Sequence, residues 1–175
     1  LKQYDPEVLR YFILASHYRS PLDYSDENLK AAKSALDGLY IALRGVGPGK
    51  AGEGEPTRRF DMAMADDFNT PAALAVLFDL ARAVNKAQGD VADAAAELRA
   101  LGGKLGLLGR DPEQYLKGGT TGGLGETEIE VLVTRRNEAR KNRDWAESDR
   151  IRDELKAQGV LLEDAPGGNT VWRRE

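Results

Sequence analysis

Helix start signals recur along the first two thirds of this sequence, and they constrain its fold more than any other feature. Asp5 and Ser25 are residues of the types that cap helices, and acidic residues suited to a first helical turn follow each of them. Pro6 stands at the first position of a helix after Asp5, and the pair Thr70 and Pro71 repeats this arrangement. Because apolar residues spaced three or four apart follow each signal, the pattern predicts a series of amphipathic helices.

One apolar face on each predicted helix is typical of a helical bundle. A further helix is expected to open at Asp90 and a short one at residues 111–113, whereas the Gly- and Pro-rich residues 44–56 are expected to form an exposed loop. The adjacent acids Asp66 and Asp67 are interpreted as turn residues rather than as a catalytic pair. The predicted domains are a connector over residues 1–24, an antiparallel helical bundle over 25–116, a flexible linker over 117–125 and a terminal module over 126–175.

The terminal module is predicted to contain two short helices and a β-hairpin. Asp144 can cap the second helix, Glu147 would complete a capping box, and Gly159 suits the left-handed position that often follows a helix. Two β-rich runs then flank residues 165–169, Ala-Pro-Gly-Gly-Asn, which are typical of a turn. The fold class is therefore expected to be mainly α, with an antiparallel helical bundle followed by a small α+β module.

Composition excludes several kinds of site. The 175 residues include no cysteine and one histidine, so disulfides and cysteine-ligated metals are excluded and no metal site is expected within the chain. The net charge of −4 argues against binding nucleic acid by bulk charge, so any RNA contact must come from local patches. Since there is no long apolar run and no signal peptide, a soluble cytoplasmic protein is expected, with no membrane partner.

The two terminal helices each carry a candidate binding face. On the first, the apolar face continues toward the C-terminus into Arg136, Arg140 and Arg143. The alternative to a binding role is that this positive charge only complements the negative end of the helix dipole. On the second, a set of polar and aromatic residues lies about a quarter turn away from the apolar side. This set consists of Trp145, Asp149, Arg152 and Lys156. The alternative for Trp145 is that it folds over the start of the helix and covers the core.

The hairpin is expected to bring further groups close to the second helix, namely Glu163, Asp164, Trp172, Arg173 and Arg174. Aromatic rings that stack, guanidinium groups that bind phosphates and carboxylates that accept hydrogen bonds from bases are the groups used to recognise single-stranded RNA. Guanine presents two adjacent donors on its Watson–Crick edge, which a fixed Asp can distinguish. The alternative is a structural hairpin whose Trp packs in the core.

The ordered set from Arg140 and Lys141 to Trp172-Arg173-Arg174 resembles the C-terminal anticodon-binding domain of bacterial cysteinyl-tRNA synthetases. The resemblance implies recognition of the GCA anticodon of cysteine tRNA. By position it implies that the main anticodon contacts are Arg140, Trp145, Asp149 and Asp164. Further RNA contacts would come from Arg136, Arg143, Arg152, Trp172, Arg173 and Arg174.

The earlier runs YDPEVLRYF, SHYRSPLDYSDENL and ADDFNTPAALAVLFDLA resemble the segment after the KMSKS loop and the DALR helical domain of the same synthetases. The resemblance places the turn at His17 near the tRNA stem or the catalytic domain. The HIGH and KMSKS signatures and the zinc-binding Cys and His residues of the family are absent from this sequence. ATP and zinc are therefore expected in a catalytic domain outside it, with no cofactor within the chain.

Two hypotheses follow. In the first, the chain is the tRNA-recognising part of a class I ligase that attaches cysteine to cysteine tRNA using ATP, inactive alone, monomeric, and partnered by cysteine tRNA and the catalytic domain of the same polypeptide. In the second, it is a helical scaffold or protein-interaction module without RNA binding. The first is favoured because the second gives no reason for Trp145, Asp149 and Arg152 to share a face away from the apolar stripe.

Overall fold

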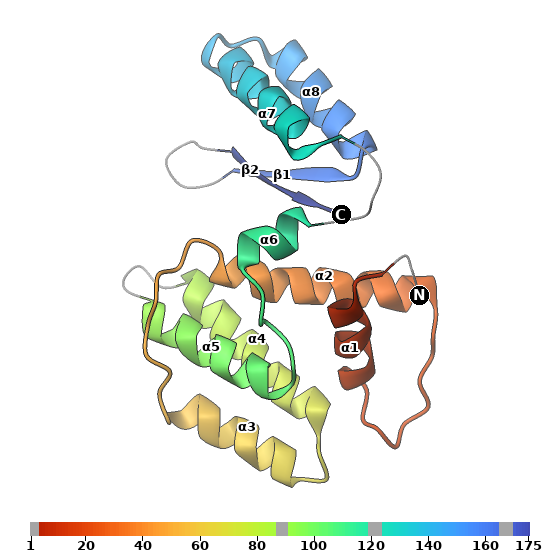
Figure 1. Cartoon of the computed structure of the whole chain (residues 1–175), viewed down its shortest axis with the longest axis vertical. Helices are drawn as coiled ribbons and strands as arrows, with labels where there is room; N and C mark the ends of the chain where they lie inside the picture. Colours follow the sequence, from red (N-terminus) through yellow and green to blue (C-terminus); the bar gives the residue numbers. More distant parts are fainter. Residues whose placement is uncertain (1–3, 87–90, 119–123, 165–169) are drawn as a thin grey trace. The chain divides into compact units, whose positions relative to one another are not determined.

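The computed structural model describes residues 4–86, 91–118, 124–164 and 170–175 (Figure 1). Three sequence predictions therefore lie outside the described residues: the helix start at Asp90, most of the 117–125 linker and the 165–169 turn. The chain divides into two compact units, Leu1–Pro112 and Glu113–Glu175. Within the described residues there are eight helices and one two-stranded sheet, so the prediction of a mainly α fold with a small hairpin is confirmed.

The first unit is built from five helices. They are α1 (Pro6–Leu14), α2 (Asp26–Leu43), α3 (Glu55–Ala65), α4 (Thr70–Lys86) and α5 (Ala92–Lys104). Helix α4 is central, since it packs against α3, α5 and α2, and α2 also packs against α1 (Figure 1). The apolar stripes of these helices meet in a core whose fully buried side chains include Leu29, Leu36, Leu39, Tyr40, Leu43, Phe60, Leu77, Leu98 and Leu101.

The helix starts in this unit follow the expected capping chemistry, with one shift. The Asp5 carboxylate accepts the N–H of Glu7 at 2.8 Å, and the Ser25 hydroxyl accepts the N–H of Asn28 at 3.2 Å. The prediction that Thr70 caps α4 is wrong. The Asn69 side chain accepts the N–H of Ala72 at 3.1 Å, and Thr70 is the first residue of the helix. Asn and Thr are both strong caps, so a local rule cannot choose between neighbours.

A buried carboxylate connects α1 to distant parts of the first unit. Glu7 is 8% exposed and accepts hydrogen bonds from the Tyr40 hydroxyl, from the N–H of Leu108 and from the guanidinium of Arg110. Arg110 also forms a bidentate pair with Asp5. Burial, together with the charge of Glu7, raises the pKa of Tyr40 to about 12. The start of α1 is thus fixed to α2 and to the turn after α5.

The second unit contains three helices and the hairpin. They are α6 (Pro112–Lys117), which begins at the boundary, α7 (Glu126–Lys141), α8 (Trp145–Ala157), β1 (Val160–Asp164) and β2 (Thr170–Arg174). The strands are antiparallel, with Leu162 opposite Trp172, and α8 packs against both α7 and β1. Gly159 adopts φ +70° at the corner from α8 into β1, as predicted. The core of the unit consists of Ile129, Val133, Ile151, Leu155, Val160 and Trp172.

Trp172 is a core residue, which corrects its assignment as an RNA contact. It is 2% exposed, its indole N–H donates to Glu130 Oε1 at 2.8 Å, and Lys117 Nζ lies 5.0 Å from the ring centroid. Arg174 is engaged as well, because it donates to the carbonyl oxygens of Lys117 and Leu124. These groups therefore hold the hairpin to the start of the unit.

Candidate functional site

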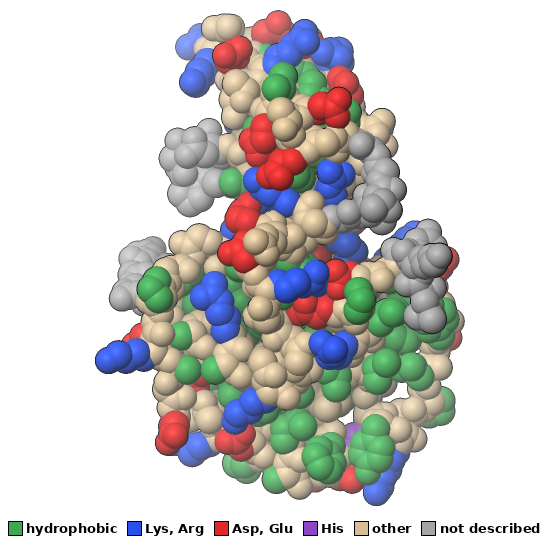
Figure 2. Space-filling model, viewed as in Figure 1, with side chains coloured by type: hydrophobic (Ala, Val, Ile, Leu, Met, Phe, Trp, Pro, Cys, Tyr) green, Lys and Arg blue, Asp and Glu red, His purple; other side chains and the backbone are tan. Residues whose placement is uncertain are grey.

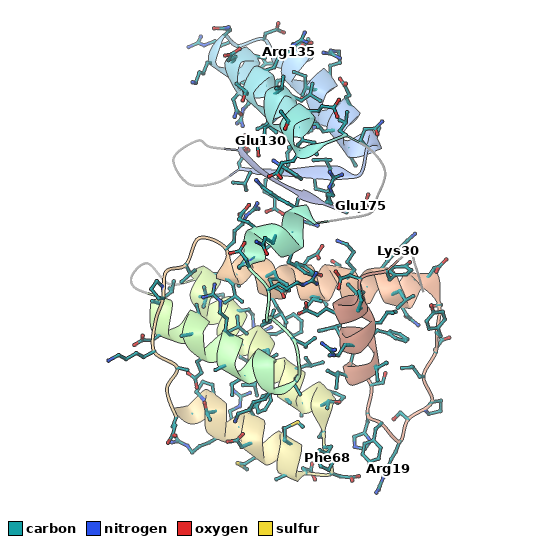
Figure 3. The ribbon with its side chains drawn as sticks, in the orientation of Figure 1. Arg19, Lys30, Phe68, Glu130, Arg135 and Glu175 are labelled. Carbon is teal, nitrogen blue, oxygen red and sulfur yellow. The ribbon has the colours of Figure 1, made fainter. Side chains whose placement is uncertain are left out.

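The candidate site is the surface of the second unit where the C-terminal half of α7, the first turns of α8 and the end of β1 carry polar and aromatic groups, all of them at least partly exposed except Arg136. We call it the α7–α8–β1 face and define it by Arg136, Arg140, Trp145, Asp149, Arg152 and Asp164. Figure 3 shows the α7–α8 end of the unit, with Arg135 labelled, as a dense array of charged side chains. Ser148, Ile151 and Leu155 are buried beneath it, as the helical periodicity predicted.

Trp145 is the most unusual member of this face. It opens α8 immediately after the cap Asp144, whose carboxylate accepts the N–H of Glu147 at 3.1 Å. The indole is 59% exposed and lies outside the hydrophobic core cluster of the unit. The idea that Trp145 covers the core is therefore wrong, and its ring is open to a stacking partner.

Asp164 and Arg140 connect β1 to α7 across the face. Arg140 donates to Asp164 Oδ1 at 2.8 Å, and both side chains are more than a third exposed. Such an exposed pair contributes at most about 1 kcal/mol, because solvent screens the charges and holding two long side chains costs entropy. Asp164 is therefore held in place by Arg140, but it is able to accept a hydrogen bond from another donor instead.

Arg136 lies behind this pair and is fixed. The residue is 8% exposed, donates to Thr170 Oγ1 at 3.0 Å and has its Nη1 atom 3.9 Å from Asp164 Oδ1. Within the described residues its Nε atom is buried without a hydrogen-bond partner. The Thr170 hydroxyl in turn donates to Asn137. Sequence reasoning missed Asn137 and Thr170, which carry no periodic or motif signal and act only by orienting Arg136.

The charges of the face act on one another. Burial lowers the pKa of Arg136, and the neighbouring charge of Arg140 lowers it further, as does that of Arg152, while Asp164 and Asp149 oppose this. Arg152 pairs with Asp149 one turn earlier at 3.1 Å, in the open. An arginine stays protonated under such a shift, so three guanidinium groups and two carboxylates share one surface. An additional anion beside Arg136 would be favourable.

Two of the arginines predicted to contact RNA, Arg173 and Arg143, are not among the residues that define this face. Arg173 pairs with Glu163 at 2.8 Å, so its role is cross-strand within the hairpin. Arg143 is exposed in the α7–α8 turn, with φ +60°, and directly precedes the cap Asp144. Glu147 pairs with Arg150 at 2.8 Å and with Arg135 at 2.7 Å, and these pairs lower the pKa of its carboxyl, the Arg150 hydrogen bond most of all. The Arg135 pair joins α7 to α8, whereas the Arg150 pair lies within α8.

The described part of the chain contains no group of three or more His, Cys, Asp or Glu side chains suited to a metal. None of its helices combines the length and apolar character needed to cross a bilayer.

Comparison with known families matches three models along the chain. Residues 1–34 match the tRNA synthetases class I (C) catalytic domain, residues 59–109 the DALR domain, and residues 123–173 the cysteinyl-tRNA ligase anticodon binding domain. The last match contains every residue of the α7–α8–β1 face.

Curated relatives agree with these matches. A cysteine–tRNA ligase of Thioalkalivibrio sulfidiphilus is 59% identical over 180 residues, covering 99% of this chain and 39% of the relative. Those of Alkalilimnicola ehrlichii and Methylococcus capsulatus are 56% and 55% identical over the whole chain. The chain spans about two fifths of the length of these relatives.

Proposed function

We propose that the chain is a C-terminal portion of a cysteine–tRNA ligase, carrying the DALR and anticodon-binding domains that it matches, and that its α7–α8–β1 face binds the GCA anticodon of cysteine tRNA. The observation that carries the proposal is the exposed Trp145 on a face with two open carboxylates and three arginines. A packing role requires no such exposure, which disfavours a scaffold without RNA.

In the proposed complex, Trp145 stacks on an unpaired anticodon base. Aromatic stacking is possible with any base, so it contributes to affinity but not to discrimination between bases. The arginines bind the adjacent phosphates. Arg136 is held rigidly by Thr170, and Arg140 becomes available to a phosphate when its partner accepts another donor.

The carboxylates supply the choice of base. The two adjacent donors of guanine fit the two oxygens of one carboxylate, and no other anticodon base offers that pair. Asp164 and Asp149 are each 61% exposed at the side chain and engaged by one exposed arginine. Exchanging a screened ion pair for two base hydrogen bonds costs little, so either carboxylate is able to make the exchange.

Activity of the whole ligase is part of the same proposal. The second unit selects cysteine tRNA, the DALR bundle supports its stem, and a catalytic domain using ATP and holding zinc attaches cysteine. The chain by itself is expected to bind the tRNA weakly and to form no cysteinyl-tRNA. We expect it to be monomeric and to act in the cytoplasm.

Substitution of the two carboxylates tests base reading. Asp149→Asn or Asp164→Asn keeps the shape but replaces one acceptor oxygen with a donor, so discrimination between GCA and variants lacking the guanine should fall by about 1–3 kcal/mol, roughly 5- to 150-fold. Binding of 17-nucleotide anticodon stem-loops measured by fluorescence anisotropy gives this ratio. The matched control is Glu154→Gln on the same helix, because the Glu154 side chain is 44% exposed and pairs with Arg150 outside this face. Equal loss for every anticodon would contradict base reading by these carboxylates.

A further inference from the structure

The first unit carries an exposed apolar surface that the anticodon proposal does not use. It comprises the end of α1, the segment that follows it and the turn between α3 and α4. We call it the α1–α4 surface and define it by Ile13, Tyr18, Leu22, Tyr24 and Phe68, which are 44–65% exposed. Figure 2 shows hydrophobic side chains gathered on the side of this unit that carries α1 and the following segment.

An open hollow of about 400 Å³ lies between the end of α1, the segment that follows it and the α3–α4 turn. Its lining residues are Ile13, Leu14, Ser16, Tyr18, Phe68 and Thr70. Figure 3 shows Phe68 and Arg19, from segments almost fifty residues apart, at the same end of the unit. A hollow lined mainly by apolar side chains is typical of a surface that another protein segment fills.

The turn that carries Phe68 is built to hold this side chain outward. Asp67 and Phe68 have φ values of +53° and +52°, in the left-handed region that costs free energy for residues other than glycine. Asp67 accepts the Tyr18 hydroxyl at 2.6 Å and pairs with Arg19 at 3.1 Å, so the strained turn is fixed to the segment after α1. This confirms that Asp66 and Asp67 belong to a turn. The left-handed backbone itself ends α3, where the N–H of Asn69 donates to the carbonyl of Ala63, but this capping does not require a large apolar ring at position 68.

The position of this surface along the chain indicates what covers it. Four of the eight large hydrophobic side chains that are exposed in the described residues lie within residues 1–34, the part that matches the class I (C) catalytic-domain model. The curated relatives are about two and a half times as long as the chain. We propose that the α1–α4 surface is the docking face for the rest of the catalytic domain, with Phe68 inserted into that interface from the α3–α4 turn.

The consequence is that the DALR bundle is held to the catalytic domain through the α3–α4 turn as well as through covalent continuity. Phe68 lies in the DALR match and Tyr18 in the catalytic-domain match, yet Asp67 joins their two segments directly. This inference concerns the first unit alone. It requires family membership but not anticodon reading by the second unit.

A full-length chimera tests the proposal without RNA. The chain replaces the matching 39% of the Thioalkalivibrio sulfidiphilus ligase, and hydrogen exchange of residues 13–24 and 66–70 is compared with that of the 175-residue chain alone. Amide exchange in these segments should slow at least tenfold in the chimera, whereas residues 145–152 should be unchanged. Unchanged exchange at 13–24 and 66–70 would overturn the proposal.

Phe68→Ser provides the second measurement. Because Phe68 is 65% exposed in the chain alone, its melting temperature should change there by less than about 1 °C, while the chimera should lose roughly 3–8 °C. Val131→Ser, at an apolar residue 62% exposed on α7, should be neutral in both proteins. Sedimentation of the chain alone identifies the other occupant. A dimer that Phe68→Ser dissociates would mean that a second copy, and not the catalytic domain, covers the surface.

Discussion

Replacing each of the two tryptophans in turn by alanine separates recognition from packing. Both lie in the second unit, but Trp145 is 59% exposed and Trp172 is 2% exposed. Trp145→Ala removes a side chain that is mostly exposed and lies outside the core cluster, so the free energy of unfolding should change by no more than about 0.5 kcal/mol. Trp172→Ala opens a cavity in the core and leaves Glu130 without its indole donor, which should cost about 3–5 kcal/mol.

The same pair should behave in the opposite way toward RNA. Stacking on one base is worth about 1–3 kcal/mol, so Trp145→Ala should weaken binding of the GCA stem-loop roughly 5- to 150-fold with the fold intact. Trp145→Phe, which keeps a smaller ring, should lose less. A unit of 63 residues has a total stability of roughly 3–9 kcal/mol, so Trp172→Ala should unfold much of it.

Urea unfolding followed by circular dichroism measures the first effect, and fluorescence anisotropy of a labelled stem-loop measures the second. Stacking on Trp145 would be refuted if the Trp145→Ala variant bound RNA as tightly as the unsubstituted chain and had an unchanged unfolding midpoint. Trp145→Ala that unfolds the unit as Trp172→Ala does would instead support a packing role and the scaffold alternative.

Two further predictions concern salt and pH. If four or five basic side chains contact single-stranded phosphates, the logarithm of the RNA affinity should fall with the logarithm of salt concentration at a slope of about −3, and a salt-insensitive complex would contradict phosphate binding. The hydrogen bond from Trp172 holds the pKa of Glu130 below its ordinary value of 4.5. The ionised Glu130 carboxylate therefore stabilises the second unit above pH 4.5, and this stabilisation is lost as pH falls through the folded pKa. The urea midpoint of the unit should drop between about pH 5 and 3. Glu130→Gln should flatten this pH dependence.

Local signals in the sequence predicted the helices well, because caps and apolar spacing act within a few residues. Asp5, Ser25 and Asp144 cap as expected, and Gly159 adopts the left-handed corner. The shift from Thr70 to Asn69 shows the limit of such rules, since two good caps stood side by side. Glu147 shows another limit: its carboxylate engages Arg135 on α7, a partner that the local motif could not reveal.

The hairpin was harder to interpret than the helices. Helical periodicity separated Trp145 from the buried side of α8, and the structure confirms its exposure. In a strand the side chains simply alternate, so either face of β2 could have met the helices. The choice depends on the pairing of Leu162 with Trp172 and on the packing of α8 against β1, which are long-range contacts. Local sequence signals therefore left Trp172 as a possible RNA contact, whereas the structure places its side chain in the core.

The arrangement of charges accounts for how an acidic chain would present the RNA-binding face proposed above. Arg136 is buried, bonded to Thr170 and beside other arginines, so it forms a fixed cationic background. The outer pairs of Arg140 with Asp164 and Arg152 with Asp149 are exposed and weak. Each carboxylate is therefore kept in position but is still able to accept hydrogen bonds from another donor. In the proposed complex, anticodon binding would exchange two screened ion pairs for base and phosphate contacts. Because arginines and carboxylates are released together, the face needs no excess positive charge in the free protein, which is consistent with a net charge of −4.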